Sequence, residues 1–64
     1  MFAVEDGYRG VLCTDGAVVT AQLVEHFGKT VRLWPTRADA ERAVALVFAK
    51  PRVVEVDEKG QALA

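Results

Sequence analysis

The sequence predicts a small α+β fold, in which a three- to four-stranded, mostly antiparallel sheet carries one main helix at 37–49 on one face. Three observations predict it. Two Asp-Gly pairs separate β-prone runs in the N-terminal half, an apolar stripe with helical spacing follows Pro35, and a valine-rich run comes next. At 64 residues the chain makes one small domain, 1–64.

The N-terminal half predicts a β-meander. Asp6-Gly7 and Asp15-Gly16 punctuate three β-prone runs between residues 2 and 20. An Asp-Gly pair in this position is a strong hairpin signal, because a type I′ turn needs positive φ at both central residues. We therefore expect two consecutive hairpins, with Gly10 marking a bulge or bend in the middle strand.

Residues 20–28 fit both the two-residue period of a strand and the 3.6-residue period of a helix. As a strand, the segment would turn most of its odd-numbered positions inward. As a helix, it would begin at Thr20 and end before Gly28 at the C′ position. The Ala, Gln, Leu and Glu residues favour the helix, so we expect a short helix here. Its apolar face would consist of Leu23, Val24 and Phe27.

Residues 30–34 alternate and predict a strand that ends at Pro35, which cannot donate a ladder hydrogen bond. Val31 and Leu33 would take one face, and Arg32 and Trp34 the other. With the helix and the strand that follow, this segment would complete a βαβ unit with parallel strands. If Val31 and Leu33 meet the helix, Trp34 points away from it.

The helix at 37–49 has clear signals at both ends. Thr36 as N-cap with Asp39 three residues later resembles a capping box, and Pro51 ends the helix. Arg37 and Glu41 would form an i,i+4 pair on the outer side. The stripe that faces the sheet would consist of Ala40, Ala43, Val44, Val47 and Phe48. Residues 53–57 predict a closing strand, and 59–64 a frayed tail.

The residue types argue against an enzyme. The chain has no serine, so no Ser-His-Asp triad is possible, and its glycines form no phosphate-binding loop. Cys13 and His26 are the one available nucleophile–base pair, and we interpret them as a buried apolar residue and a surface residue. One Cys and one His also fall short of a zinc site, so we expect no metal or cofactor.

Charge and hydropathy indicate a cytoplasmic protein. Glu5 and Asp6 interrupt the N-terminus before any signal-peptide core could form, and no apolar run could span a bilayer. The net charge is −1, but segment 29–52 holds six Lys and Arg against two acids. This segment supports a nucleic-acid-binding alternative, although nucleic-acid modules usually carry a stronger basic footprint.

We therefore predict a protein-binding module that works by contact and forms a homodimer through a partly bare sheet face. An accessory domain of a larger complex is a further alternative. Trp, Tyr and Arg dominate the energetics of protein interfaces. The predicted contact surface is Tyr8, Arg32, Trp34 and Arg37.

The segment from Val31 to Ala43, a strand ending in an aromatic residue, then Pro-Thr-Arg, then an alanine-bearing helix, resembles a module of small phage and mobile-element proteins of ββαβ type. The resemblance covers under a quarter of the chain. It implies a stand-alone phage protein that regulates or inhibits a host protein complex. Anti-defence proteins such as anti-CRISPR inhibitors are one such class, but they share no motif, so no site residue is carried over.

Overall fold

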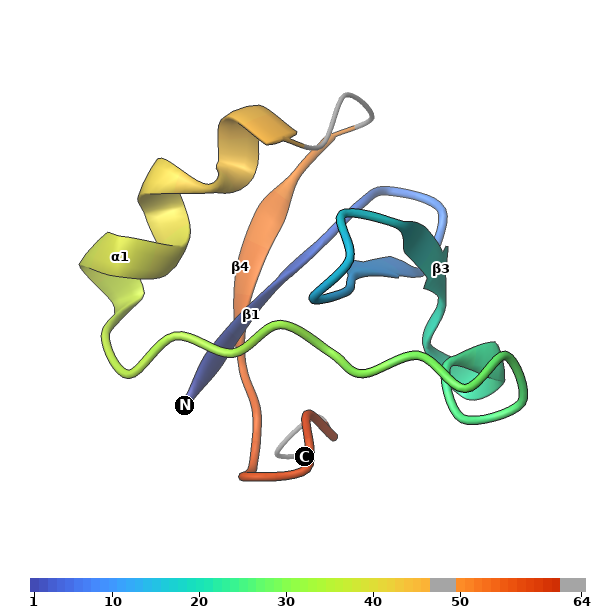
Figure 1. The fold of residues 1–64 in the computed structure, drawn as a ribbon. Helices are drawn as coiled ribbons and strands as arrows, with labels where there is room; N and C mark the ends of the chain where they lie inside the picture. Colours follow the sequence, from blue (N-terminus) through green and yellow to red (C-terminus); the bar gives the residue numbers. More distant parts are fainter. Residues whose placement is uncertain (47–49, 62–64) are drawn as a thin grey trace.

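The computed structural model describes residues 1–46 and 50–61, and it shows a four-stranded antiparallel sheet with one α-helix packed on it (Figure 1). The strand order is β3-β2-β1-β4. The predicted α+β class, the antiparallel sheet and the single helix on one face are confirmed. The strands are β1 (Phe2–Glu5), β2 (Gly10–Leu12), β3 (Val18–Thr20) and β4 (Arg52–Glu55). The helices are α1 (Arg37–Arg42) and two 3₁₀ turns, η1 (Ala21–Leu23) and η2 (Val44–Leu46).

The meander β1-β2-β3 is as predicted, but its turns are not of type I′. In the first turn the Asp6 carboxylate accepts hydrogen bonds from the backbone N–H groups of Tyr8 (2.8 Å) and Gly10 (2.7 Å). The positive φ of that turn belongs to Arg9, and that of the second to Gly16. A type I′ turn needs two such residues in a row. The aspartates instead bind the backbone through their side chains, as Asx-turns do.

The predicted strand at 30–34 is not a strand of the sheet, and no parallel βαβ unit forms. The segment makes two isolated antiparallel bridges with different partners, Val31 with Cys13 and Trp34 with Phe2. Its backbone bonds to Leu12 and Thr14 at one end and to Phe2 at the other, so it changes partner along its length. Figure 1 shows it running past the start of β1 towards α1. β4 pairs with β1 in an antiparallel register instead.

Helix α1 begins where the sequence predicts, since the Thr36 hydroxyl accepts a hydrogen bond from the backbone N–H of Asp39 (3.2 Å). It ends earlier than predicted. At Ala43 the backbone N–H bonds to the Ala40 carbonyl (3.0 Å), and this i to i+3 bond tightens the chain into η2. Positions 47–49 of the predicted helix lie outside the described residues.

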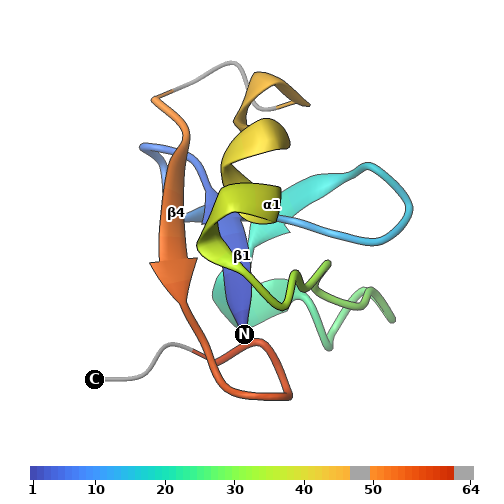
Figure 2. The same ribbon diagram turned by 90° about the vertical axis from the view of Figure 1, so that its left-hand side faces the viewer.

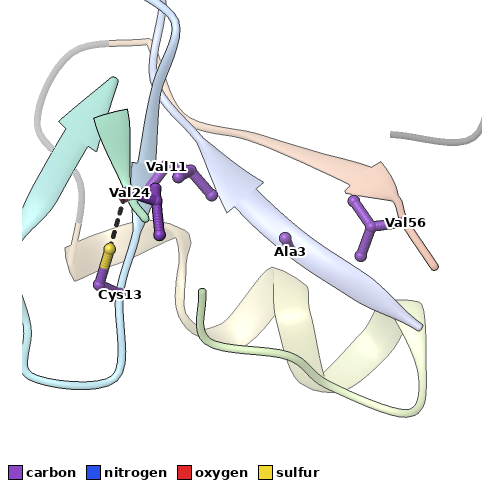
Figure 3. Packing of buried hydrophobic residues seen from close by; sticks show 5 residues of the cluster. All are labelled: Ala3, Val11, Cys13, Val24 and Val56. Atoms are coloured by element: carbon purple, nitrogen blue, oxygen red, sulfur yellow. Dashed lines mark hydrogen bonds between the residues drawn. The ribbon is translucent and has the colours of Figure 1, made fainter. Parts of the chain in front are cut away.

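Two apolar clusters occupy the two faces of the sheet. Neighbouring residues of β1, Ala3 and Val4, are both fully buried and belong to different clusters, because successive side chains of a strand point to opposite faces. Viewed from its own side, α1 lies in front of β1 (Figure 2). The helix-side cluster consists of Val4, Leu12, Ala40 and Ala43, with Phe2, Trp34, Val44 and Val53 packed against it. The opposite cluster consists of Ala3, Val11, Cys13, Val24 and Val56 (Figure 3).

The second sheet face is covered, which corrects the expected bare face. Val24 packs into the opposite cluster from the segment after η1. A second cover comes from the turn at 57–61, where a side chain on Gly60 would meet the Val31 Cβ at 2.8 Å. The predicted frayed tail is therefore ordered at 59–61, because the Asp57 carboxylate accepts backbone N–H bonds from Lys59 and Gln61. Residues 62–64 lie outside the described part.

Segment 20–28 is neither a strand nor the continuous short helix that we expect: Thr20 ends β3, η1 covers Ala21–Leu23, and residues 24–28 form hydrogen-bonded turns. η1 opens it without a side-chain cap from Thr20, and Gly28, with φ +66°, ends it. The N–H of Gly28 bonds to the Glu25 carbonyl and that of Lys29 to the Val24 carbonyl, which is the Schellman pattern. Its predicted apolar face is not all inward. Val24 is buried, whereas Leu23 and Phe27 are exposed.

Candidate interaction surface

Phe2 and Trp34 form the base of the candidate surface. Each backbone N–H bonds to the other residue's carbonyl, at 2.8 and 2.9 Å. Residues in such an antiparallel pair lie about 5.5 Å apart between Cα atoms, with their side chains on the same face. Both rings are half-buried and pack against the helix-side cluster.

This placement reverses the predicted direction of Trp34. Val31 and Leu33 pack against the opposite cluster, and Trp34 packs on the side of the helix. The side chains of the segment do alternate between the two faces, but alternation alone does not say which face meets the helix. The bridge to Phe2 decides it, because Trp34 must share the face that Phe2 and Val4 take on β1.

Two arginines cover these rings. The guanidinium carbon of Arg32 lies 5.4 Å from the centroid of the Trp34 ring, and that of Arg37 lies 5.1 Å from the centroid of the Phe2 ring. These are cation–π distances. Both arginine residues are exposed. We call Phe2, Arg32, Trp34 and Arg37 the arginine–aromatic surface.

Arg37 does not form the predicted pair with Glu41, since its side chain lies over Phe2. The ion pair on α1 is instead Arg42 with Asp39, at 3.7 Å. Within residues 1–46 and 50–61, neither Arg32 nor Arg37 has a carboxylate partner, and neither donates a side-chain hydrogen bond. Their N–H groups are therefore available to a ligand.

The structure brings together three of the four predicted contact residues and separates the fourth. Tyr8 is 78% exposed in the loop after β1, whereas Phe2 is at the start of that strand. Sequence reasoning missed Phe2. Its alternation with Val4 indicates a core-facing side chain, but nothing in the sequence shows that Trp34 would pair with it.

The basic segment 29–52 does not form one continuous patch. Three of its cations are already paired with carboxylates: Lys29 with Asp15, Arg42 with Asp39, and Arg52 with Glu5. Lys50 lies beside Gly7, at the other end of β1 from Phe2. Arg32 and Arg37 are thus the cations near the two rings whose charge no carboxylate among the described residues compensates.

Cys13 and His26 are not brought together as a reactive pair. Cys13 is buried and its thiol donates to the Val11 carbonyl (3.6 Å, Figure 3), and burial raises the pKa of the Cys13 thiol. His26 is exposed, and its ring stacks edge-on against Phe27 at 5.1 Å. Among the described residues, no group of three or more His, Cys, Asp and Glu side chains could hold a metal ion.

A cleft of about 570 Å³ lies on the opposite side of the sheet from α1. Its walls come from β1, β2, the segment around η1 and the turn at 57–61, and they carry both Glu and Lys side chains. Charges of both signs at its walls indicate no single class of ligand. In the part of the chain that the structure covers, no helix is long and apolar enough to cross a bilayer.

Comparison with protein-family models, with curated proteins and with solved structures finds no match to this chain.

Proposed function

We propose that this chain is a small, non-enzymatic protein-binding module and that the arginine–aromatic surface contacts the partner. One observation carries the proposal. Two exposed arginines lie over two adjacent, half-buried rings and have no carboxylate partner among the described residues. Arg and aromatic side chains on a rigid support are typical of interface hot spots. The regulator of a host complex implied by the resemblance of Val31–Ala43 is one form of such a module.

The support is rigid because the rings belong to the core. Trp34 and Phe2 are joined by two backbone hydrogen bonds and pack against the cluster under α1. Each arginine is held over a ring, so it loses less conformational freedom on binding than an unrestrained surface arginine would. A preorganised charge of this kind favours a specific partner over general attraction.

The test is capture of partners from a lysate of the source cells, with the tagged chain as bait. The double variant Arg32→Ala, Arg37→Ala should lose about tenfold or more of the captured partner, since each hot-spot arginine contributes 1 kcal/mol or more. The matched control is Arg42→Ala, Lys59→Ala, which removes the same charge from exposed residues outside the surface. Bound proteins are quantified by mass spectrometry after nuclease treatment.

Equal capture by all three proteins would show that the partner binds elsewhere. Loss of capture after nuclease treatment, with the wild-type chain, would show that nucleic acid mediates it and would overturn the proposal.

A further inference from the structure

Resting on the proposed function, we infer that the partner presents two carboxylates, from Asp or Glu side chains, to Arg32 and Arg37. The first reason is the geometry of the guanidinium groups. The guanidinium carbons of Arg32 and Arg37 lie 5.4 and 5.1 Å from the ring centroids, so each cation is attracted to a ring without spending a hydrogen-bond donor. Neither side chain donates a hydrogen bond within the described residues. The N–H donors lie in the guanidinium plane and stay free, and they match a carboxylate in a two-bond fork.

The second reason is what the arginines do to the rings. One side of each ring faces the helix-side cluster, and a guanidinium lies over the ring of Trp34 and over that of Phe2. A nucleic-acid base needs a bare ring face on which to stack. Stacking of bases here would require displacement of the arginines, so the rings hold the cations instead of offering a platform.

The third reason is the size of the positive area. Glu55 lies opposite Phe2 on β4, and Asp39 on α1 is engaged by Arg42. The arginine–aromatic surface thus holds two guanidinium groups that have no carboxylate partner among the described residues. A nucleic-acid backbone is bound by a longer row of cations. Two guanidinium groups correspond to two carboxylates of a short acidic segment.

The test is a titration followed by NMR, since short peptides bind weakly and NMR detects weak binding. The probes are a hexaglutamate peptide, a hexaglutamine peptide and a single-stranded oligothymidylate of equal charge to the hexaglutamate. The reporters are the Nε–H signals of Arg32 and Arg37 and the indole N–H signal of Trp34. Hexaglutamate should shift these signals to saturation, and added salt should weaken the binding.

The variant Arg32→Lys, Arg37→Lys separates the contribution of the two-bond guanidinium–carboxylate geometry from that of the positive charge. It keeps both positive charges and loses the planar donors, so hexaglutamate should bind it about threefold or more weakly than it binds the wild type. Circular dichroism checks that the variant is folded. Arg42→Lys is the control, and it should leave the affinity unchanged because Arg42 lies outside the surface.

Tighter binding of the oligothymidylate than of hexaglutamate would overturn the inference in favour of nucleic acid. Equal shifts with hexaglutamine, or shifts that spare both arginines, would show that carboxylates are not the ligand. The lysate experiment separates the two proposals. Arginine-dependent capture of a protein with no response to hexaglutamate leaves the binding function standing and overturns the carboxylate assignment alone.

Discussion

Trp34 is a core residue and a surface residue at once. Its inner side packs against the cluster under α1, and Arg32 lies over its ring. Loss of the ring therefore removes apolar burial and the support of an arginine together. Under the proposed function, substitutions at Trp34 should change stability and binding jointly, whereas substitutions of Arg32 should test binding nearly alone.

We expect Trp34→Ala to lower the free energy of unfolding by about 2 kcal/mol, roughly half the cost of truncating a fully buried aromatic residue. Arg32→Ala should change it by less than about 0.5 kcal/mol, because the side chain is exposed and unpaired. Urea unfolding followed by circular dichroism measures both. Trp34→Phe is the control and should retain most of the stability. Equal costs for the two alanine variants would show that Trp34 is not part of the core.

The ion pair of Asp15 with Lys29 should make the free energy of unfolding depend on pH in the acid range. A hydrogen bond from the Lys29 ammonium, then one from the Ala17 backbone N–H, lowers the pKa of Asp15 below its ordinary range. The pKa of Lys29 is raised by the same contact. A lowered acid pKa stabilises the fold above the ordinary carboxyl range and loses this effect as the pH falls through the lowered value. A raised lysine pKa stabilises it below the ordinary lysine range and loses this as the pH rises through the raised value.

We therefore expect the stability difference between the wild type and Lys29→Met to be constant near neutral pH and to shrink as the pH falls below the ordinary carboxyl range. The side chains are exposed, so the difference is small, and paired urea titrations across acidic pH are needed to resolve it. Asp15→Asn in the same series should show little further acid dependence of this kind. A difference that persists unchanged through the acid range would rule out Asp15 as the partner that matters.

At the scale of elements, the turn at 57–61 acts as a lid on the opposite cluster. Gly60 has φ +83°, and a Cβ there would meet the Val31 Cβ at 2.8 Å. Gly16 has a nearly equal φ of +87°, with nothing within 4 Å of the corresponding position. The two glycines thus share a backbone conformation and differ in their surroundings.

We expect Gly16→Ala to cost about 1 kcal/mol, from the backbone conformation alone. Gly60→Ala should cost about 1–3 kcal/mol more, because the turn must move away from Val31. Thermal or urea unfolding of the pair measures the difference directly. Equal costs would mean that the turn does not pack on Val31.

The elements that were predicted well are those with local causes. The Thr36 cap, the end of segment 20–28 at Gly28 and the two hairpins each follow from hydrogen bonds within a few residues of sequence. The segment at 30–34 was predicted wrongly because its conformation depends on Cys13 and Phe2, which are distant in sequence. The end of α1 was also predicted wrongly, because the apolar stripe continues through Val44 and does not distinguish an α-helix from the 3₁₀ turn η2.

In the candidate site, too, the features with local causes could be predicted and those that depend on residues distant in sequence could not. Arg32, Trp34 and Arg37 lie within six positions of each other, so their proximity could be inferred from the sequence. The sequence could not show that Phe2 belongs to the surface or that Tyr8 lies away from it. Both positions depend on the pairing of Phe2, at the start of β1, with Trp34. The direction of Trp34 was also decided by that pairing.

At the scale of the whole molecule, β1 joins the two clusters. Ala3 lies in one cluster and Val4 in the other, and both are fully buried. Neither cluster can open widely without disturbing the strand that they share. We therefore expect the domain to unfold as one cooperative unit.

Cys13 reports on this cooperativity, because the residue is buried in the opposite cluster. Its modification by an aromatic disulfide reagent should be slow in the folded protein and fast in urea. Val24→Ala and Val4→Ala weaken different clusters, yet each should speed the reaction about tenfold for every 1.4 kcal/mol of stability lost. A much larger acceleration by Val24→Ala than its stability cost would show that the opposite cluster opens on its own.

Burial on both sides of the sheet has a consequence for how the strands find each other. Where one face of a sheet is exposed to solvent, a one-residue shift in strand register moves apolar side chains into water, which costs free energy. Here Val53 and Val54 are both half-buried on β4, as Ala3 and Val4 are both buried on β1, so a slipped strand would still bury apolar groups. The choice among alternative pairings must then come from side-chain size, from the aspartate-bonded turns and from the Glu5–Arg52 contact at 3.1 Å. The sequence must therefore disfavour a register in which β4 is shifted by one residue along β1.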